Sequence, residues 1–385
     1  MLFSVSMSCR PTRGKKMSEE KPTQTSEPRT KAEADEDTAS PAVPSADVST
    51  DESPASPPTE QEQNQGSATA LEAEQANEQE PQEEPKPPEC WFITGANGNL
   101  GQRLVRHLLA EGASVTAVVR SGRAEQSLAR ALNFNKQLRI EVIDYAETML
   151  LAQAAYGAQY AVHLVGILKA TKNATYAKAH EASCTALVRA LKDTSVEHIT
   201  YLSILGAKPS SGNACLASKG KAERILHRSP ITACTLRVPM VIGERDYVSK
   251  MLAQRASLKS SVTFRAASLE QPIYAGDVVD AICAAARLGL DGGLNLAGPE
   301  SLTREELYKR AAAVLGRTTS VRSVPIVFGY AIAWLLELFS SEPPITRAML
   351  GVLDHDDQIN VAKAQQMLGL HELTDLDTML RKAVR

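Results

Sequence analysis

The chain has 385 residues, a formal net charge of -3 and 43% apolar residues, which is ample for a folded domain plus a long extra segment. Its six cysteines form no C-x-x-C pair and no histidine cluster accompanies them. The composition therefore argues against a zinc site or a disulfide framework, and we expect no bound metal. No apolar stretch reaches the roughly 18 residues that cross a membrane, so we predict no membrane span.

Charge is distributed unevenly along the chain. Residues 18–89 carry 19 acidic and 4 basic side chains, and residues 18–88 contain no Phe, Trp, Tyr or Ile. Such a segment buries too little surface to offset its ordering entropy, so residues 1–88 are predicted to form a disordered acidic tail. The rest of the chain is basic. Either the tail folds back on it, or it attracts phosphates, or the charges keep the protein soluble, and we favour the last interpretation.

The first 17 residues lack acids and carry Arg10 and Arg13, a pattern that resembles a mitochondrial transit peptide. Because the segment is short for a transit peptide, we favour Met17 as the true first residue. We therefore expect a cytoplasmic location, peripheral to a membrane as one option. The mitochondrial matrix is the alternative.

A glycine-rich turn follows the first predicted strand. Residues 90–101 read CWFITGANGNLG, with glycines spaced G-x-x-G-x-x-G before an amphipathic helix that begins near Leu100. Glycine permits the sharp turn, the approach of a pyrophosphate and close packing of helix on strand. The context disfavours a turn without a ligand. The residues predicted to hold a dinucleotide are Gly95, Asn97, Gly98, Asn99, Leu100 and Gly101.

The second predicted strand, Ser114–Val119, ends at Arg120. In dinucleotide-binding folds a carboxylate at this place bonds the ribose of NAD, whereas an arginine accommodates the 2′-phosphate of NADP. No acid follows until Glu125. We therefore predict NADP(H) in preference to NAD(H), with a solvated arginine as the alternative.

Further strands alternate with helical patterns, which predicts an α/β fold with a Rossmann-type doubly wound parallel sheet. Asp144 follows the strand Leu138–Ile143 and is predicted to reach the adenine. Leu164 and Gly166, at the end of Tyr160–Val165, are further predicted cofactor contacts. We expect a nucleotide-binding domain over residues 89–243. A small C-terminal α/β lobe over 244–385, with part of the sheet, should close over the cofactor.

Several motifs occur in a fixed order after the glycine turn: HLVGIL (163–168), YLSILGA (201–207), SKGKAE (218–223), LRVP (236–239), QPIYAGDV (271–278), AGPESLT (297–303) and EPPIT (342–346). Together they resemble atypical, extended members of the short-chain dehydrogenase/reductase superfamily. They are most similar to the NADPH-binding accessory subunit of respiratory complex I and its bacterial relatives. The resemblance implies a Ser203–Lys219 pair at the catalytic position, Pro239 beside the nicotinamide, and a larger respiratory or membrane-associated complex as a partner.

The chain departs from this pattern at one position. Active members of the superfamily use a tyrosine four residues before the lysine as proton donor, and Cys215 stands there. A thiol is shorter than a phenol, so we interpret Cys215 as a small buried residue. A substitute role for Tyr201 is a remote option.

The C-terminal half contains two predicted helix starts and one apolar segment. Asp277 is predicted to cap a helix over 278–288, and Thr303 to open a capping box for a helix ending at Leu315. Residues 324–339 are predicted to form a buried or surface-docking helix. The scattered basic residues of 244–270 are not accompanied by an interleaved aromatic platform, so we expect no nucleic-acid partner.

Three functions remain open. The first is a protein that holds NADP(H) structurally or as a redox sensor with little catalysis. The second is an NAD(P)-dependent oxidoreductase or epimerase with another proton donor, and the third is a scaffold that binds nothing. The intact glycines favour the first two, and Cys215 favours the first over the second.

Overall fold

The computed structural model describes residues 87–133, 135–340 and 342–384. The predicted acidic tail therefore lies outside the described residues, apart from its last two positions.

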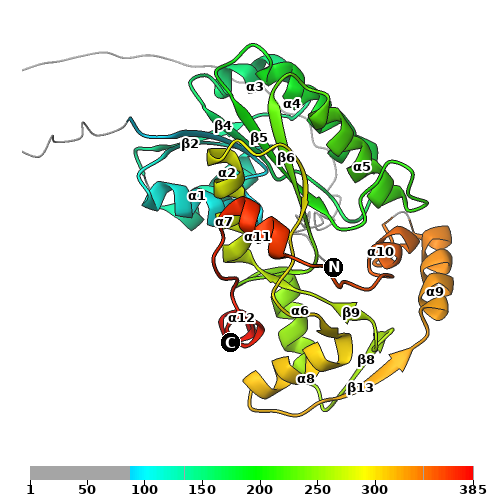
Figure 1. The fold of residues 1–385 in the computed structure, drawn as a ribbon. Helices are drawn as coiled ribbons and strands as arrows, with labels where there is room; N and C mark the ends of the chain where they lie inside the picture. Colours follow the sequence, from blue (N-terminus) through cyan, green and yellow to red (C-terminus); the bar gives the residue numbers. More distant parts are fainter. Residues whose placement is uncertain (1–86, 134, 341, 385) are drawn as a thin grey trace, which may run out of the picture. The chain divides into compact units, whose positions relative to one another are not determined.

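A seven-stranded parallel sheet forms the centre of the fold, in the order β11-β6-β5-β4-β1-β2-β3 (Figure 1). Its strands are β1 (Cys90–Thr94), β2 (Ser114–Val119), β3 (Leu138–Val142), β4 (Tyr160–His163), β5 (His198–Ile204), β6 (Thr232–Val238) and β11 (Gly292–Asn295). The chain runs outward from β1 to β3 and then returns to β4 on the other side of β1. This reversal confirms the doubly wound sheet and places a ligand-binding crevice at the carboxyl ends of β1 and β4.

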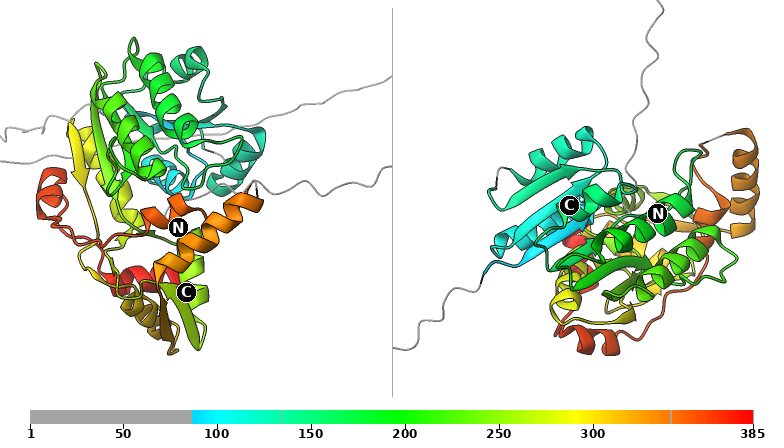
Figure 2. Two further views of the ribbon diagram at one scale, coloured as in Figure 1. Left: turned by 90° about the vertical axis from the view of Figure 1, so that its right-hand side faces the viewer. Right: turned by 90° about the horizontal axis from the view of Figure 1, so that it is seen from above.

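Helices cover both faces of the sheet (Figures 1 and 2). One hydrophobic core contains α1 (Asn99–Ala110), α2 (Gly122–Leu132) and α7 (Ala275–Arg287). The other contains α3 (Thr148–Ala154), α4 (Ser183–Leu191) and α5 (Ala214–His227), with the π-helix η1 (Ala177–Ala182) leading into α4. The apolar spacing of α1 explains its position, because Leu104, Val105 and Leu108 lie on one side and are buried.

A smaller lobe is built from the C-terminal half around a third core. Its helices are α6 (Tyr247–Ala256), α8 (Arg304–Val314) and α12 (Leu376–Val384). Three strand pairs accompany them: β7 (Val241–Ile242) with β10 (Ile273–Tyr274), β9 (Leu269–Glu270) with β12 (Leu302–Thr303), and β8 (Ser260–Phe264) with β13 (Ser320–Val324). Inside the lobe the buried Arg304 guanidinium pairs with the Glu270 carboxylate at 2.5 Å.

The two halves of the chain interlock. Strand β11 and helix α7 come from the C-terminal half but join the central sheet and its helical layer. Three more helices follow: α9 (Ile326–Phe339), α10 (Arg347–Val352) and α11 (Ala362–Leu368). Residues of α10 pack in a small apolar cluster with Cys215 of α5. Among the described residues, no helix is long and apolar enough to cross a membrane.

The predicted cap at Asp277 is wrong. Helix α7 begins at Ala275, and the Asp277 carboxylate accepts hydrogen bonds from the backbone N–H and the hydroxyl of Thr374, at 2.8 and 2.7 Å. A local pattern cannot find these donors, since they come from 97 residues further along the chain. Thr303 does cap α8, where its hydroxyl accepts the Glu306 N–H. That helix ends at Val314, one residue before the predicted end.

Candidate functional site

The glycine turn is held by backbone contacts that leave no room for side chains. Gly95 has φ +79°, and a Cβ on it would lie 3.1 Å from the Leu164 carbonyl carbon. A Cβ on Gly101 would lie 2.7 Å from the carbonyl oxygens of Gly95 and Ala96. The turn after β1 therefore packs against the end of β4 and against the first turn of α1, as the spacing of the glycines predicted.

The start of helix α1 has the properties of an anion site. Gly98 occupies its N-cap, no side chain caps it, and its first turn contains no acid. Free N–H groups and the positive end of the helix dipole thus meet at the carboxyl edge of the sheet. The residues fit a pyrophosphate, because the tight glycine turn leaves the backbone open to close approach.

The Asn97, Asn99 and Leu100 positions differ in what they contact. The Asn97 carbonyl accepts a hydrogen bond from the Gln102 side chain at 2.9 Å, and Leu100 packs on the core. The Asn99 amide oxygen accepts from Arg103, which in turn forms a 2.5 Å ion pair with Glu244. No sequence pattern predicted the Arg103–Glu244 pair, although a cation one turn into the helix was a visible signal.

Tyr145 is a second residue that the sequence analysis missed. Its hydroxyl accepts the Gly95 N–H at 2.9 Å, and burial raises its pKa to about 12. The Arg120 guanidinium lies over its ring, 5.7 Å from the centroid. Arg120 is exposed, and no carboxylate of the described residues pairs with it. Asp144 is exposed nearby, where its carboxylate accepts the Ala146 N–H.

Lys219 lies at the ends of β4 and β5. Its ammonium donates to the Leu202 carbonyl at 2.8 Å and lies 4.3 Å from the centre of the Tyr201 ring. A Cβ on Gly166 would lie 3.0 Å from the Lys219 Nζ, so the lysine side chain fits here because Gly166 has no side chain. Burial lowers the pKa of Lys219 to about 8.

Ser203 is fully buried in β5 and belongs to an ionic cluster. Its hydroxyl donates to the Glu223 carboxylate at 2.5 Å, and Glu223 also binds the Arg237 guanidinium. The next residue, Ile204, is the one that shares a cluster with Cys215. The geometry adds no support for Ser203 as the residue that orients a substrate oxygen, so that role stays a prediction.

Cys215 is buried among apolar side chains. Its neighbours in the cluster are Leu168, Ile204, Met349 and Val352, and burial raises its pKa to about 11. Tyr201 is also fully buried, and burial raises its pKa well above the ordinary value. Both side chains are buried, so neither is placed to give a proton to a substrate.

Tyr176 is a third residue that no sequence pattern singled out. It packs against the Cys215 cluster, stacks on the His180 ring at 5.8 Å and donates to the Leu168 carbonyl at 2.8 Å. Burial raises its pKa to about 12. It is half-buried, whereas Cys215 and Tyr201 are buried. Nothing in the sequence marked it, because it lies at the start of the π-helix η1, in a stretch without clear periodicity.

Pro239 directly follows β6 and is buried. The neighbouring Met240 carbonyl accepts the Ile273 N–H at 2.9 Å, which fixes this segment against β10. Among the residues the structure describes, no group of three or more His, Cys, Asp or Glu could hold a metal ion.

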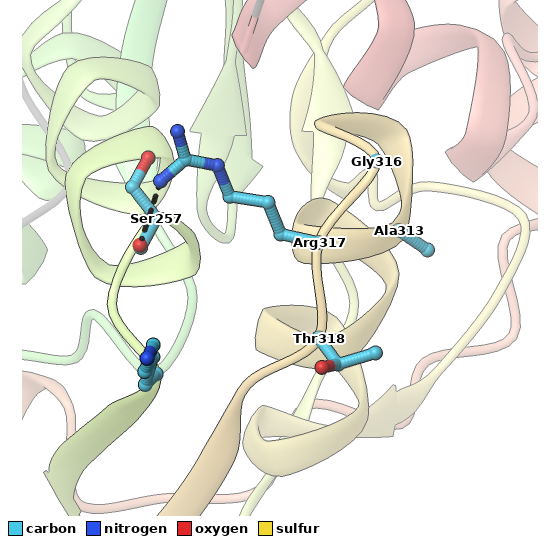
Figure 3. Close-up of a pocket in the computed structure, with 6 residues that line it drawn as sticks. Ser257, Ala313, Gly316, Arg317 and Thr318 are labelled. Carbon is cyan, nitrogen blue, oxygen red and sulfur yellow. Dashed lines mark hydrogen bonds between the residues drawn. The ribbon is translucent and has the colours of Figure 1, made fainter.

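A cavity of about 520 Å³ lies elsewhere, at the C-terminal ends of α6 and α8 (Figure 3). It is lined by Ser257, Lys259, Ala313, Gly316, Arg317 and Thr318. Arg317 crosses it and donates to the Ser257 carbonyl at 3.1 Å. Helix C-termini carry the negative end of the dipole, so this cavity is a poor site for a pyrophosphate. It contains none of the predicted site residues.

Comparisons with known proteins indicate an NAD(P)H-binding domain. Residues 95–267 match the family model described as NAD(P)H-binding. The chain is 27% identical over 240 residues to the ceramide reductase of Caulobacter vibrioides, covering 60% of this chain and 73% of that enzyme. It is 24% identical over 192 residues to the mitochondrial 40 kDa subunit of NADH-ubiquinone oxidoreductase from Neurospora crassa, covering 49% of this chain and 50% of the subunit.

The fold has solved counterparts. A UDP-glucuronic acid 4-epimerase from Bacillus cereus, determined with NAD, superposes with a TM-score of 0.61. The superposition covers 77% of this chain and 98% of the epimerase, at 16% sequence identity. At this identity the likeness shows the fold alone.

Proposed function

We propose that the protein is an NAD(P)-binding relative of the short-chain dehydrogenases/reductases, since residues 95–267 match the NAD(P)H-binding family model, and that it binds NADP(H) in preference to NAD(H). We further propose that it holds the cofactor structurally or as a redox sensor, with little turnover by the usual tyrosine–lysine route. The observation that carries the cofactor preference is Arg120, exposed at the end of β2 above Tyr145. A guanidinium there matches a phosphate in charge and geometry.

The residues assigned to the cofactor divide by what they would contact. The turn from Gly95 to Gly101 would hold the pyrophosphate, Arg120 the 2′-phosphate and Asp144 the adenine. Leu164, Gly166 and Pro239 would lie along the rest of the dinucleotide, and Lys219 would bind the nicotinamide ribose. When bound, the cofactor would supply or accept a hydride.

The proposed lack of turnover rests on the proton donor. Cys215 is buried with its pKa near 11, and the Ser203 hydroxyl is engaged by Glu223. A carbonyl reduction needs a proton on the oxygen as well as a hydride on the carbon, and these two side chains do not offer one.

A second candidate function is reduction of a lipid-like carbonyl. Its support is the similarity to a ceramide reductase and the place of Tyr176 beside the Cys215 cluster. In this reaction the hydride from NADPH would form the C–H bond, and the Tyr176 phenol would give its proton to the carbonyl oxygen. The products would be an alcohol and NADP⁺.

One set of measurements separates the two candidates. Calorimetry on the full chain measures affinities for NADPH and NADH, and NADPH absorbance is followed with carbonyl compounds from short ketones to long-chain keto lipids. Tight NADPH binding without oxidation supports the first function, whereas steady oxidation contradicts it. In the second case Tyr176→Phe should abolish the oxidation and Cys215→Ala should not.

Assembly and location belong to the same proposal. We propose that the protein associates with a larger respiratory or membrane-associated complex from the cytoplasmic side, as its relation to a complex subunit suggests. The mitochondrial matrix is the alternative location. A fluorescent fusion to the C-terminus of the full chain, followed by native electrophoresis of isolated membranes, tests both points. A free monomer in every fraction would contradict the association.

A further inference from the structure

Helix α9 turns its apolar side chains outward. The exposed fractions are 71% for Val327, 61% for Phe328, 63% for Leu338 and 80% for Phe339. Ile332, Trp334 and Leu335 are each at least half-exposed, whereas Gly329 and Ala333 are the buried positions. The helix lies at the outside of the fold, away from the central sheet (Figures 1 and 2). Soluble monomers rarely expose so continuous an apolar surface.

The polar groups of α9 are turned toward the protein instead. Its one charged residue, Glu337, pairs with Arg347 at 2.7 Å, and the Tyr330 hydroxyl donates to Asp354. The outward face therefore carries no charge. This distribution reverses that of an ordinary surface helix, so water is a poor environment for this face.

Two lysine-rich loops border this face. Residues 166–180 and 205–213 contain four lysines (Lys169, Lys172, Lys178 and Lys208) and no carboxylate. The first loop packs against α10, the neighbour of α9, since Tyr176 shares an apolar cluster with Met349 and Val352. The second does so through Asn213, whose amide donates to the Ala348 carbonyl at 2.8 Å. We call α9 and these two loops the docking face.

The composition of the docking face indicates which kind of partner covers it. Residues 18–86 contain no Phe, Trp, Tyr or Ile and so offer no apolar cover. Residues 1–17 do contain Leu2 and Phe3, but they carry four basic side chains and no acid, so they would repel the lysines of the rim. A second copy would bring lysines of the same sign to the rim and would neutralise none of them. An anionic bilayer offers both an apolar interior and negative headgroups.

We propose that the docking face binds the surface of an anionic membrane, with α9 lying in the interfacial plane. Fourteen residues make a helix of about 21 Å, too short to span the hydrocarbon core but suited to lie in its boundary. Trp334 is the residue type that anchors at this depth. The two loops follow β4 and β5, so docking brings the carboxyl edge of the sheet close to the lipid.

The proposal goes beyond cofactor binding and does not depend on whether turnover occurs. It is tested by sedimenting the full chain with phosphatidylcholine vesicles, with and without phosphatidylglycerol. We expect binding to the anionic vesicles that weakens with added salt, because the lysines act through screened charge. Phe328→Glu combined with Leu335→Glu should weaken binding about tenfold or more.

A matched control comes from α3 and the turn that follows it. Met149 and Tyr156 are 78% and 88% exposed, so Met149→Glu with Tyr156→Glu changes charge and exposed apolar area similarly. This control should bind vesicles like the unaltered protein. Both double variants should keep their NADPH affinity and unfolding temperature, which separates docking from folding and from the proposed cofactor function.

Three outcomes overturn the proposal. Sedimentation of the α9 variant equal to that of the unaltered protein removes the role of the helix. Absence of vesicle binding excludes an anionic membrane as the partner of the docking face. A dimer in analytical ultracentrifugation that the α9 substitutions dissociate, without vesicle binding, assigns the face to a second copy.

Discussion

At the glycine turn the close contacts join backbone atoms, whereas around Cys215 and Lys219 they join side chains. Gly101 faces carbonyl oxygens of its own chain at 2.7 Å, and Gly95 faces the backbone of Leu164. Cys215 instead lies among Leu168, Met349 and other side chains. The backbone conformation of the turn depends on a few glycines, and the loss of any one of them disturbs the whole turn. Side-chain chemistry changes with one substitution, so a site can keep its nucleotide cradle while its proton donor is replaced.

The largest effect should come from adding a side chain in the glycine turn. Gly101→Ala places a Cβ against backbone atoms that cannot rotate away. We expect NADPH affinity to fall by about tenfold or more, and the free energy of unfolding by about 1–3 kcal/mol. Gly212→Ala is the control, because a Cβ there meets nothing within 4 Å. Equal NADPH affinities of the two variants in calorimetry would argue against the glycine turn as the phosphate site.

Arg120→Asp tests the cofactor preference at the same end of the site. A hydrogen bond to a charged group is worth about 1.5–3 kcal/mol, so the ratio of NADPH to NADH affinity should fall by about 10- to 100-fold. Arg130→Asp, also exposed but at the last turn of α2, should leave that ratio unchanged. If the Arg120 variant still prefers NADPH, the assignment of the 2′-phosphate is incorrect.

The histidines at the other end of the site predict acid sensitivity. Burial lowers the pKa of His163 to about 3 and that of His180 to about 2, from 6.5. Below pH 6.5 the unfolded chain takes up protons that the folded chain does not, so stability is full above 6.5 and declines as the pH falls. Each histidine contributes up to about 1.4 kcal/mol per pH unit to this decline.

The measurement is urea unfolding between pH 6.5 and 5, where most carboxylates stay ionised. His180→Gln should reduce the slope of the unfolding free energy against pH by up to about 1.4 kcal/mol per pH unit, the contribution of one histidine. His107→Gln, at a partly exposed position, serves as the control. An unchanged slope in the His180 variant would show that this ring is protonated equally in both states.

The smallest effect should follow from removing the Cys215 thiol. Because that thiol is buried with a raised pKa, Cys215→Ala should leave NADPH affinity and any NADPH oxidation within about twofold. Cys215→Tyr tests whether the usual phenol restores turnover. The larger side chain must displace Met349 and Val352. We expect it to lower stability by about 1–3 kcal/mol in thermal unfolding without adding turnover. A gain of turnover would mean that the proton donor alone was missing.

Local patterns predicted much of the fold. The apolar run 91–93, the three glycines and the apolar spacing of α1 fixed a strand, a turn and a helix, because each depends on residues only a few positions apart. The alternation of such units then predicted the parallel sheet. The same local logic predicted Gly95 and Gly101 as nucleotide contacts and a helix near 324–339, which the structure places at Ile326–Phe339. Lys219 was predicted from the family resemblance instead.

Only the tertiary structure decided which distant groups meet. The Ser203 hydroxyl faces Glu223, Tyr145 binds the glycine turn, and Thr374 supplies the donors for Asp277. It also decided that the apolar side of α9 points outward, since the composition of that helix suits burial equally well. The physical reason is that hydrogen bonds and burial depend on positions in space. The sequence alone determines those positions over a few residues, and the packing of the whole chain determines the rest.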